Sequence, residues 1–138
     1  MPLKTGPIIQ GHPHVSIQVS SDGKTGKVFL AMIDTGFSGF VSVPSAAARV
    51  LGLDARATAR YTMADGRSSE PFPLAEGFAC IEGEHYVNGL ISVSENATTV
   101  IGMNFLRRTG KALILGSGGV VIMSESDLMA ALRAATSD

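Results

Sequence analysis

The sequence predicts a mostly β fold in which short strands close into an antiparallel barrel and the helices are brief. Three observations indicate this class. Sixteen glycines, with six Phe, two Tyr and no Trp, favour many short strands joined by tight turns. Stretches of alternating apolar residues recur at strand length along the chain. The composition, with 45% apolar and 17% charged residues, is typical of a globular chain and not of a disordered one.

Length and charge set the expected organisation and partners. A chain of 138 residues supports one hydrophobic core, so we expect a single domain over 1–138, with its core at about 14–123 and a terminal helix at 124–138. A net charge of −1 gives no electrostatic case for binding nucleic acid or an anionic membrane surface. The first ten residues lack an apolar stretch of signal-peptide length, and no window approaches a membrane span, so we expect a cytoplasmic protein.

The first part of the chain is a series of strands. Residues 14–20 alternate between polar and apolar, and residues 21–26 form a turn. Residues 28–33 are an unbroken apolar run, which predicts a fully buried strand. Residues 40–43 return as another strand, and a short helix is expected over 44–53, with proline near its start and glycine near its end.

Asp34-Thr35-Gly36 follows the buried strand directly. A carboxylate that activates water must be held rigidly, and Asp34 is the candidate. Gly36 lacks a Cβ, so main-chain donors can approach that carboxylate, and the Thr35 hydroxyl can tie the loop to a neighbouring copy of itself. The alternative is that the triplet is only a strand-ending turn, since Asp and Gly favour turns for local reasons.

A hairpin is predicted after the short helix. Residues 57–64 and 67–72 flank Asp65-Gly66, a dipeptide suited to a type I′ turn. Such a hairpin either closes over a bound peptide or is an ordinary solvent-exposed hairpin.

The second half of the chain contains strands and two more helices. A short helix over 103–108 ends at Gly110, and the terminal helix has Ser124 or Ser126 as its N-cap. Leu128, Met129, Ala131 and Leu132 give that helix an apolar stripe. The strands expected here are 77–82, 84–94, one ending at 100–102, 111–115 and 119–123.

The segment Val100-Ile101-Gly102 leads into Met103-Asn104-Phe105-Leu106, which is two apolar residues and a glycine followed by a helix opening in x-Asn-x-Leu. Together with Asp-Thr-Gly and the hairpin between them, this segment makes the chain resemble a retropepsin-like aspartic protease domain of the cellular and bacterial type. The resemblance covers roughly Val15 to Met123 and implies one half of a closed acid-protease barrel.

The resemblance implies an aspartic endopeptidase that is active as a homodimer. Aspartic proteolysis uses two carboxylates, whereas this chain has one Asp-Thr-Gly, so Asp34 of two copies would meet at a two-fold axis. The dyad would activate water to hydrolyse an extended polypeptide, without a metal or cofactor. His12 and His14 straddle Pro13, but no cysteine or carboxylate ligand set accompanies them, so no metal site is expected.

The resemblance also assigns roles to individual residues. Asp34, Thr35 and Gly36 would be catalytic, and apolar cleft walls would favour hydrophobic residues beside the cleaved bond. This chain has Ser38 and Met103 where viral retropepsins carry an acidic residue and its arginine partner, so that viral ion pair is not expected. The residues that would line or cover the substrate are Phe37, Ser38, Met63, Ala64, Asp65, Gly66 and Val100.

Two other functions fit parts of the pattern. A catalytically inactive retropepsin-like module would bind peptides or dimerise without cutting. An unrelated small β-barrel would bind a ligand, and this would be favoured if residues 57–72 did not form a hairpin over Asp34.

Overall fold

The computed structural model describes residues 3–136 of the chain. Most of its elements are short strands, and three helices lie between or after them. In chain order they are β1 (Lys4–Gly6), β2 (Ile8–Ile9), β3 (His12–Ser20), β4 (Gly26–Ile33), β5 (Val41–Pro44), α1 (Ser45–Leu51), β6 (Ala55–Ala59), β7 (Phe72–Ile81), β8 (Val87–Ser94), β9 (Val100–Ile101), α2 (Met103–Arg108), β10 (Lys111–Gly116), β11 (Gly119–Ser124) and α3 (Glu125–Thr136).

The larger sheet closes on itself. Its strands follow the order β2-β3-β4-β9-β5-β8-β7-β6, and an additional pairing of β3 with β7 completes a ring. Most neighbours are antiparallel, but β4 pairs with β9 and β5 pairs with β8 in parallel. The predicted mostly β fold with short helices and a C-terminal helix is therefore confirmed, and closure leaves few free edges in the body of the molecule.

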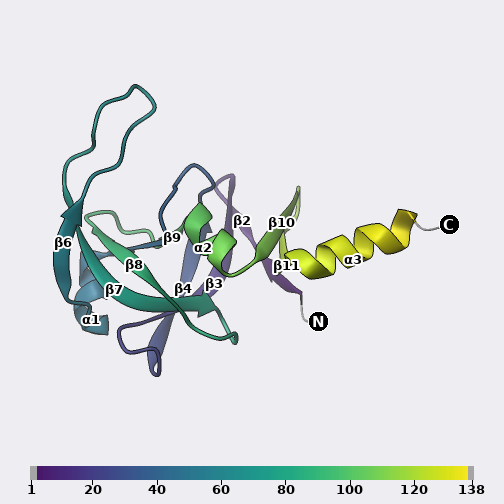
Figure 1. Ribbon diagram of the computed structural model, residues 1–138, viewed down its shortest axis with the longest axis horizontal. Helices are drawn as coiled ribbons and strands as arrows, with labels where there is room; N and C mark the ends of the chain where they lie inside the picture. The colour runs from purple at the N-terminus through teal and green to yellow at the C-terminus, as the bar shows by residue number, and fades with distance from the viewer. Residues whose placement is uncertain (1–2, 137–138) are drawn as a thin grey trace.

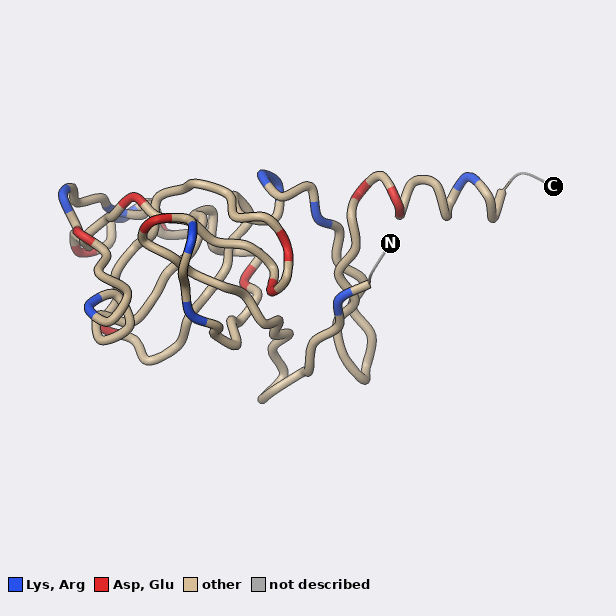
Figure 2. The backbone as a smooth tube through the Cα atoms, turned by 90° about the horizontal axis from the view of Figure 1, so that it is seen from below, with Lys and Arg blue, Asp and Glu red and all other residues tan. Residues whose placement is uncertain are grey.

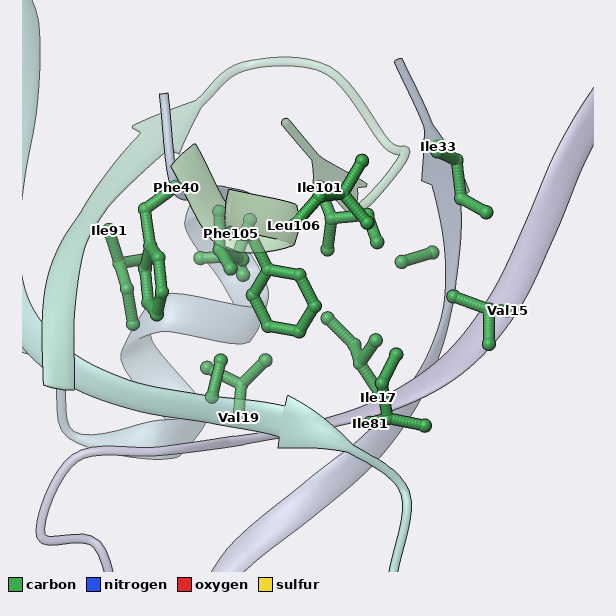
Figure 3. Packing of buried hydrophobic residues seen from close by; sticks show 14 of the residues in the cluster. Val15, Ile17, Val19, Ile33, Phe40, Ile81, Ile91, Ile101, Phe105 and Leu106 are labelled. Carbon is green, nitrogen blue, oxygen red and sulfur yellow. The ribbon is translucent and has the colours of Figure 1, made fainter. Parts of the chain in front are cut away.

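The barrel interior is a continuous apolar cluster (Figure 3). The alternation predicted for the first hairpin places one face of β3 inside, where Ile17 and Val19 have no exposed surface. Phe105 enters from α2 and is also completely buried, with its ring centroid 5.5 Å from that of Phe40. Burying such a side chain contributes about 1.5–3 kcal/mol, so α2 is held on the barrel mainly through this residue.

The predicted full burial of residues 28–33 is wrong for one face of the strand. Val28 and Leu30 are 51% and 46% exposed, while Ala31 and Ile33 point into the core. The continuous apolar run hides an alternation, because β4 has the barrel interior on one side and solvent on the other.

The segment between β6 and β7 extends away from the barrel (Figure 1). Only the bridge between Thr62 and Ser68 pairs its two arms, so the predicted hairpin is real but mostly irregular. The predicted type I′ turn is wrong, because Gly66 has a positive φ of 85° whereas Asp65 does not. The Asp65 carboxylate instead accepts the Arg67 N–H at 3.0 Å, which favours a turn with only one left-handed residue.

A second, three-stranded sheet of order β1-β11-β10 lies beside the barrel and leads into α3, which projects from the molecule (Figure 1). Ser124 is the N-cap, as one of the two predictions had it, and accepts the Asp127 N–H at 3.1 Å. No residue of α3 is fully buried, and Met129 and Leu132 are 47% and 50% exposed. The last predicted positions of this helix, 137–138, lie outside the described residues.

Charged residues of both signs are interspersed along the backbone (Figure 2). Within residues 3–136, no helix has both the length and the apolar character needed to cross a membrane.

The turn between β3 and β4 depends on an ionised carboxylate. Hydrogen bonds from the N–H of Thr25 at 3.0 Å, the N–H of Lys24 at 2.8 Å and the hydroxyl of Ser20 at 2.9 Å lower the pKa of Asp22 from 3.8 to about 2. Since the folded pKa lies below the unfolded one, this carboxylate stabilises the fold above about pH 4, and the contribution is lost as the pH falls through about 2.

We therefore expect Asp22→Asn to lower the urea midpoint of unfolding near neutral pH, and the difference from the wild type to vanish as the pH approaches 2. Circular dichroism during urea titration at several pH values measures it. A difference that stays constant across this range would mean that the charge of Asp22 is not the cause.

Candidate active site

Asp34 directly follows β4. The chain then runs to β5, which is separated from β4 in the sheet by β9. Strand β9 sits between β4 and β5, with Ile33 in parallel register with Ile101 and Val41 in antiparallel register with the same residue. The loop of residues 34–40 therefore passes over the end of β9. This arrangement sets Asp34 on the barrel wall and not at the tip of a free hairpin.

The loop itself orients the Asp34 side chain. The N–H of Asp34 donates to the carbonyl of Ile101 at 3.0 Å, and the N–H of Phe37 donates to the carbonyl of Asp34 at 3.1 Å. The N–H of Gly36 donates to Oδ1 of the carboxylate at 2.9 Å. Across residues 3–136, no group donates a hydrogen bond to Oδ2, so the second oxygen is available for chemistry.

Residues 102–104 clamp this loop from the other side through three backbone hydrogen bonds of 2.8 to 3.1 Å to residues 37–40. The approach is close enough to require glycine at 102, because a Cβ there would lie 2.4 Å from the carbonyl oxygens of both Phe37 and Gly39. Real Cβ atoms do not make contacts this short. The Gly102 segment that resembled the second retropepsin signature therefore supports the Asp34 loop physically.

A cavity of about 380 Å³ opens on one side of Asp34. Asp34, Phe37 and Val100 line its floor, and residues 70–73 and 92–96 line its walls. The cavity is of the size that holds part of a small ligand or a few side chains of a peptide.

An aromatic wall bounds this cavity. The Tyr61 ring lies edge-on to Phe37, with centroids 5.3 Å apart, and stacks on Phe72 at 4.3 Å. The hydroxyl of Tyr61 donates to Ser92 Oγ at 3.4 Å. Burial raises the pKa of Tyr61, so its hydroxyl remains a neutral hydrogen-bond donor over the working pH range.

A second cavity, of about 470 Å³, is also lined by Asp34 but shares no other lining residue with the first. Met32, Ile33 and Thr35 line it together with Leu113 and Leu115 of β10, so it is largely apolar. Asp34 therefore stands between the aromatic-walled cleft and an apolar hollow beside an edge strand.

The structure brings together some of the residues that the sequence singled out. Asp34, Phe37 and Val100 share the cleft. Thr35 faces the apolar hollow, and Ser38 lines a neighbouring cavity. The four residues Met63, Ala64, Asp65 and Gly66 are exposed at the tip of the extended loop and line none of these cavities.

Ser38 and Met103 are uncharged, so no ion pair can form between these two side chains. Instead the N–H of Met103 donates to the carbonyl of Phe37 at 2.8 Å. A backbone hydrogen bond therefore joins the Asp34 loop to the start of α2.

Sequence reasoning missed Tyr61, Phe72, Glu70 and Glu95 as cleft residues. A signal was available for the first two, because Tyr61 and Phe72 are aromatic residues in the two arms of the predicted hairpin, in a chain with only two Tyr and six Phe. For the two glutamates no local pattern distinguishes them from other surface residues.

No cluster of three or more His, Cys, Asp or Glu positioned to hold a metal ion occurs in the part of the chain that is described. The His14 ring is instead within 2.8 Å of the carbonyl of His12.

Solved structures resemble this chain over most of its length. A retropepsin-like aspartic protease from Rickettsia conorii matches with a TM-score of 0.63 and 16% identity, covering 88% of this chain and 90% of that one. The EIAV protease, complexed with the inhibitor HBY-793, matches with a TM-score of 0.54 and 16% identity, covering 78% and 96%. The chain has a retropepsin-like fold. No protein-family model and no curated protein sequence matches it.

The retropepsin-like fold agrees with the resemblance that the sequence showed at two segments, Asp34 to Gly36 and the one around Gly102. At 16% identity the similarity shows the fold alone, so the chemistry of the site must be argued from its own residues. Those residues give one Asp-Thr-Gly loop, one Gly102 clamp and two cavities that meet at Asp34.

The clamp makes a direct prediction for stability. Gly102→Ala should lower the free energy of unfolding by about 1–3 kcal/mol, because the new Cβ would push the carbonyls of residues 37 and 39 away. Chemical denaturation measures the change.

Gly118→Ala is the matched control, since a Cβ at Gly118 meets no atom within 4 Å. It should alter stability by less than about 0.5 kcal/mol. Equal effects of the two substitutions would contradict the close approach at Gly102.

Proposed function

We propose that this protein is an aspartic endopeptidase that cleaves extended polypeptide segments as a homodimer. The observation that carries the proposal is the position of Asp34, which lies between a peptide-sized cleft and an apolar hollow beside an unpaired strand edge. The retropepsin-like fold supports it. A chain with one such carboxylate needs a second copy to complete the chemistry.

Strand β10 offers the edge for that second copy. It is the last strand of the sheet β1-β11-β10, so one row of its backbone groups is unpaired. Its Ile114 and Leu115 are 46% and 62% exposed, although both are apolar. Two copies pairing through β10 would form an isologous interface, with the same strand contributed by both subunits.

The same strand connects the interface to the catalytic residue. Leu113 and Leu115 line the hollow that contains Asp34 and Thr35. A partner bound along β10 would therefore cover this hollow and carry its own Asp34 loop towards that of the first subunit. The Thr35 hydroxyl, which has no hydrogen bond within the described part of the chain, would then bond across the axis.

Two such carboxylates would divide the catalytic work. Like charges in contact cannot both ionise, so the pair shares one proton. The ionised carboxylate removes a proton from water, the resulting hydroxide attacks the carbonyl carbon of the scissile bond, and the protonated carboxyl gives its proton to the carbonyl oxygen. The carboxyl that took the proton from water then gives it to the amide nitrogen, and the other carboxylate takes a proton from one hydroxyl of the tetrahedral intermediate. The C–N bond breaks to give a carboxylic acid and an amine, and the dyad again holds one proton. No metal takes part in these steps.

The cleft supplies the surfaces for the peptide. Phe37 and Val100 form apolar walls that favour hydrophobic side chains beside the cleaved bond. The loop of residues 60–71, with Met63 to Gly66 at its tip, would close over the bound segment and exclude water, as active-site flaps do.

Asp34→Asn is the first test. Removing the acid–base group should lower kcat/KM for a peptide by at least about 10²–10⁴-fold without changing the fold. Cleavage of a degenerate peptide library at mildly acidic pH, followed by mass spectrometry, measures the loss.

Asp54→Asn is the control, because Asp54 is an exposed carboxylate paired only with Arg56. It should retain full activity. If Asp34→Asn cuts as fast as the wild type, Asp34 has no part in the reaction. If neither protein yields a product while both bind peptides, the molecule is a binding module and not a protease.

The interface is tested separately with Leu115→Arg. A guanidinium at this position would be placed in the apolar hollow and near its own copy, so the dimer dissociation constant should rise by about tenfold or more, with a parallel loss of activity. Light scattering and sedimentation measure the mass.

Val50→Arg introduces the same charge on α1 at a residue that is 67% exposed, and it should leave the mass and the activity unchanged. A Leu115→Arg protein that remains a fully active dimer would overturn the assignment of β10 to the interface.

A further inference from the structure

Another cavity adjoins the cleft on the far side of the aromatic wall. It has a volume of about 320 Å³, and its walls include Tyr61, Phe72 and Ser92, which also line the cleft beside Asp34. Ser38, which belongs to the Asp34 loop, lines it as well. The two cavities therefore share a wall and are neighbours on the surface of the protein.

The charged side chains of this cavity are two arginines, Arg60 and Arg108, and no carboxylate lines it. They come from different elements, since Arg60 follows β6 and Arg108 ends α2. Arg108 is positioned by the Phe40 ring, with its guanidinium carbon 5.6 Å from the ring centroid. We call this cavity the arginine pocket.

Neither guanidinium has an ion pair or a hydrogen bond to any residue in the range 3–136. The other arginines near this loop differ, because Arg56 pairs with Asp54 at 2.8 Å and Arg67 pairs with Asp65 at 2.7 Å. The arginine pocket thus gathers two cations and leaves both without an anionic partner from the chain.

The cleft beside Asp34 has the opposite charge. It is lined by the carboxylates Asp34, Glu70 and Glu95 and by no Lys or Arg. The charged side chains that line the two neighbouring cavities are therefore of opposite sign. Such a division selects partners by charge, because a side chain of the wrong sign is repelled as strongly as the right one is attracted.

We propose that the arginine pocket is a subsite for an acidic side chain of the substrate, with Arg60 and Arg108 holding its carboxylate. The proposal rests on the proposed peptidase function and adds a charge requirement to it. Arginine presents donors in a planar fork that matches a carboxylate. In an extended peptide, alternate side chains point the same way about 6.5–7 Å apart, so neighbouring side chains of one face can enter the two cavities on either side of the wall.

The preference is tested with a degenerate decapeptide library whose ends are acetylated and amidated, so that only side chains carry charge. Cleavage products identified by mass spectrometry should show Asp and Glu enriched at one outer position relative to the cut. A single peptide with Glu at that position should be cleaved with a kcat/KM about fivefold higher than its Gln counterpart.

Arg60→Gln and the double variant Arg60→Gln/Arg108→Gln should abolish this ratio, so that the Glu peptide and the Gln peptide are cleaved equally well by each variant. Arg60→Gln is the decisive one, since the exposed Arg60 side chain has no ion pair, hydrogen bond or ring contact within residues 3–136, whereas Arg108 packs on Phe40. Arg107→Gln is the matched control, because Arg107 is the exposed neighbour on α2 and does not line the pocket. It should keep the ratio.

Binding to Asp34→Asn, measured by fluorescence polarisation with the same labelled Glu and Gln peptides, separates this proposal from the peptidase itself. Tighter binding of the Glu peptide, lost in Arg60→Gln/Asp34→Asn, supports the subsite even without turnover. Equal binding or cleavage of the two peptides, or an acidic preference that survives the double arginine variant, overturns the subsite and leaves the peptidase intact. If no peptide of the library is bound or cleaved, both the subsite and the proposed peptidase function are overturned.

Discussion

The insertion of β9 between β4 and β5 is the constraint on which the site depends. Because β9 occupies the space between them, the loop that joins β4 to β5 must cross its end, and the backbone of residues 102–104 holds that loop by three hydrogen bonds. The close approach permits only glycine at position 102. Asp34 is therefore oriented by main-chain hydrogen bonds, including the one that the Gly36 N–H donates to its carboxylate.

The position of Asp34 supports the proposal that this fold is half of a catalytic unit. Asp34 borders both a cleft walled by aromatic rings and an apolar hollow that ends at β10, whose outer edge is unpaired among the described strands. A monomer leaves Leu115 62% exposed beside its only Asp-Thr-Gly carboxylate. In the proposed dimer, pairing of two copies along β10 would bury that surface and supply the second carboxylate, so assembly and catalysis would depend on the same strand.

The sequence predicted local features well, but it predicted poorly those features that residues from distant elements form together. The strand end that carries Asp34, the helix over 103–108 and the Ser124 cap follow from short-range patterns, and the structure has all three. The catalytic role of Asp34 stays a prediction. The aromatic wall and the arginine pocket arise only when β6, β7, β8 and α2 meet in space, and periodicity carries no information about such meetings. The type I′ prediction failed because the Asp65 side chain bonds to Arg67, a competition that the dipeptide rule omits. The prediction that residues 28–33 are fully buried was wrong, because an unbroken apolar run does not reveal that one face of the strand is exposed to solvent.

The most direct measurement is the separation of the two Asp34 carboxylates in a crystal structure of the assembly whose mass matches that found in solution. The account predicts a two-fold symmetric dimer joined along β10, with the nearest carboxylate oxygens about 3 Å apart and one water bound by both carboxylates. A monomer at all concentrations, or a dimer in which the Asp34 side chains are remote from each other, would contradict it.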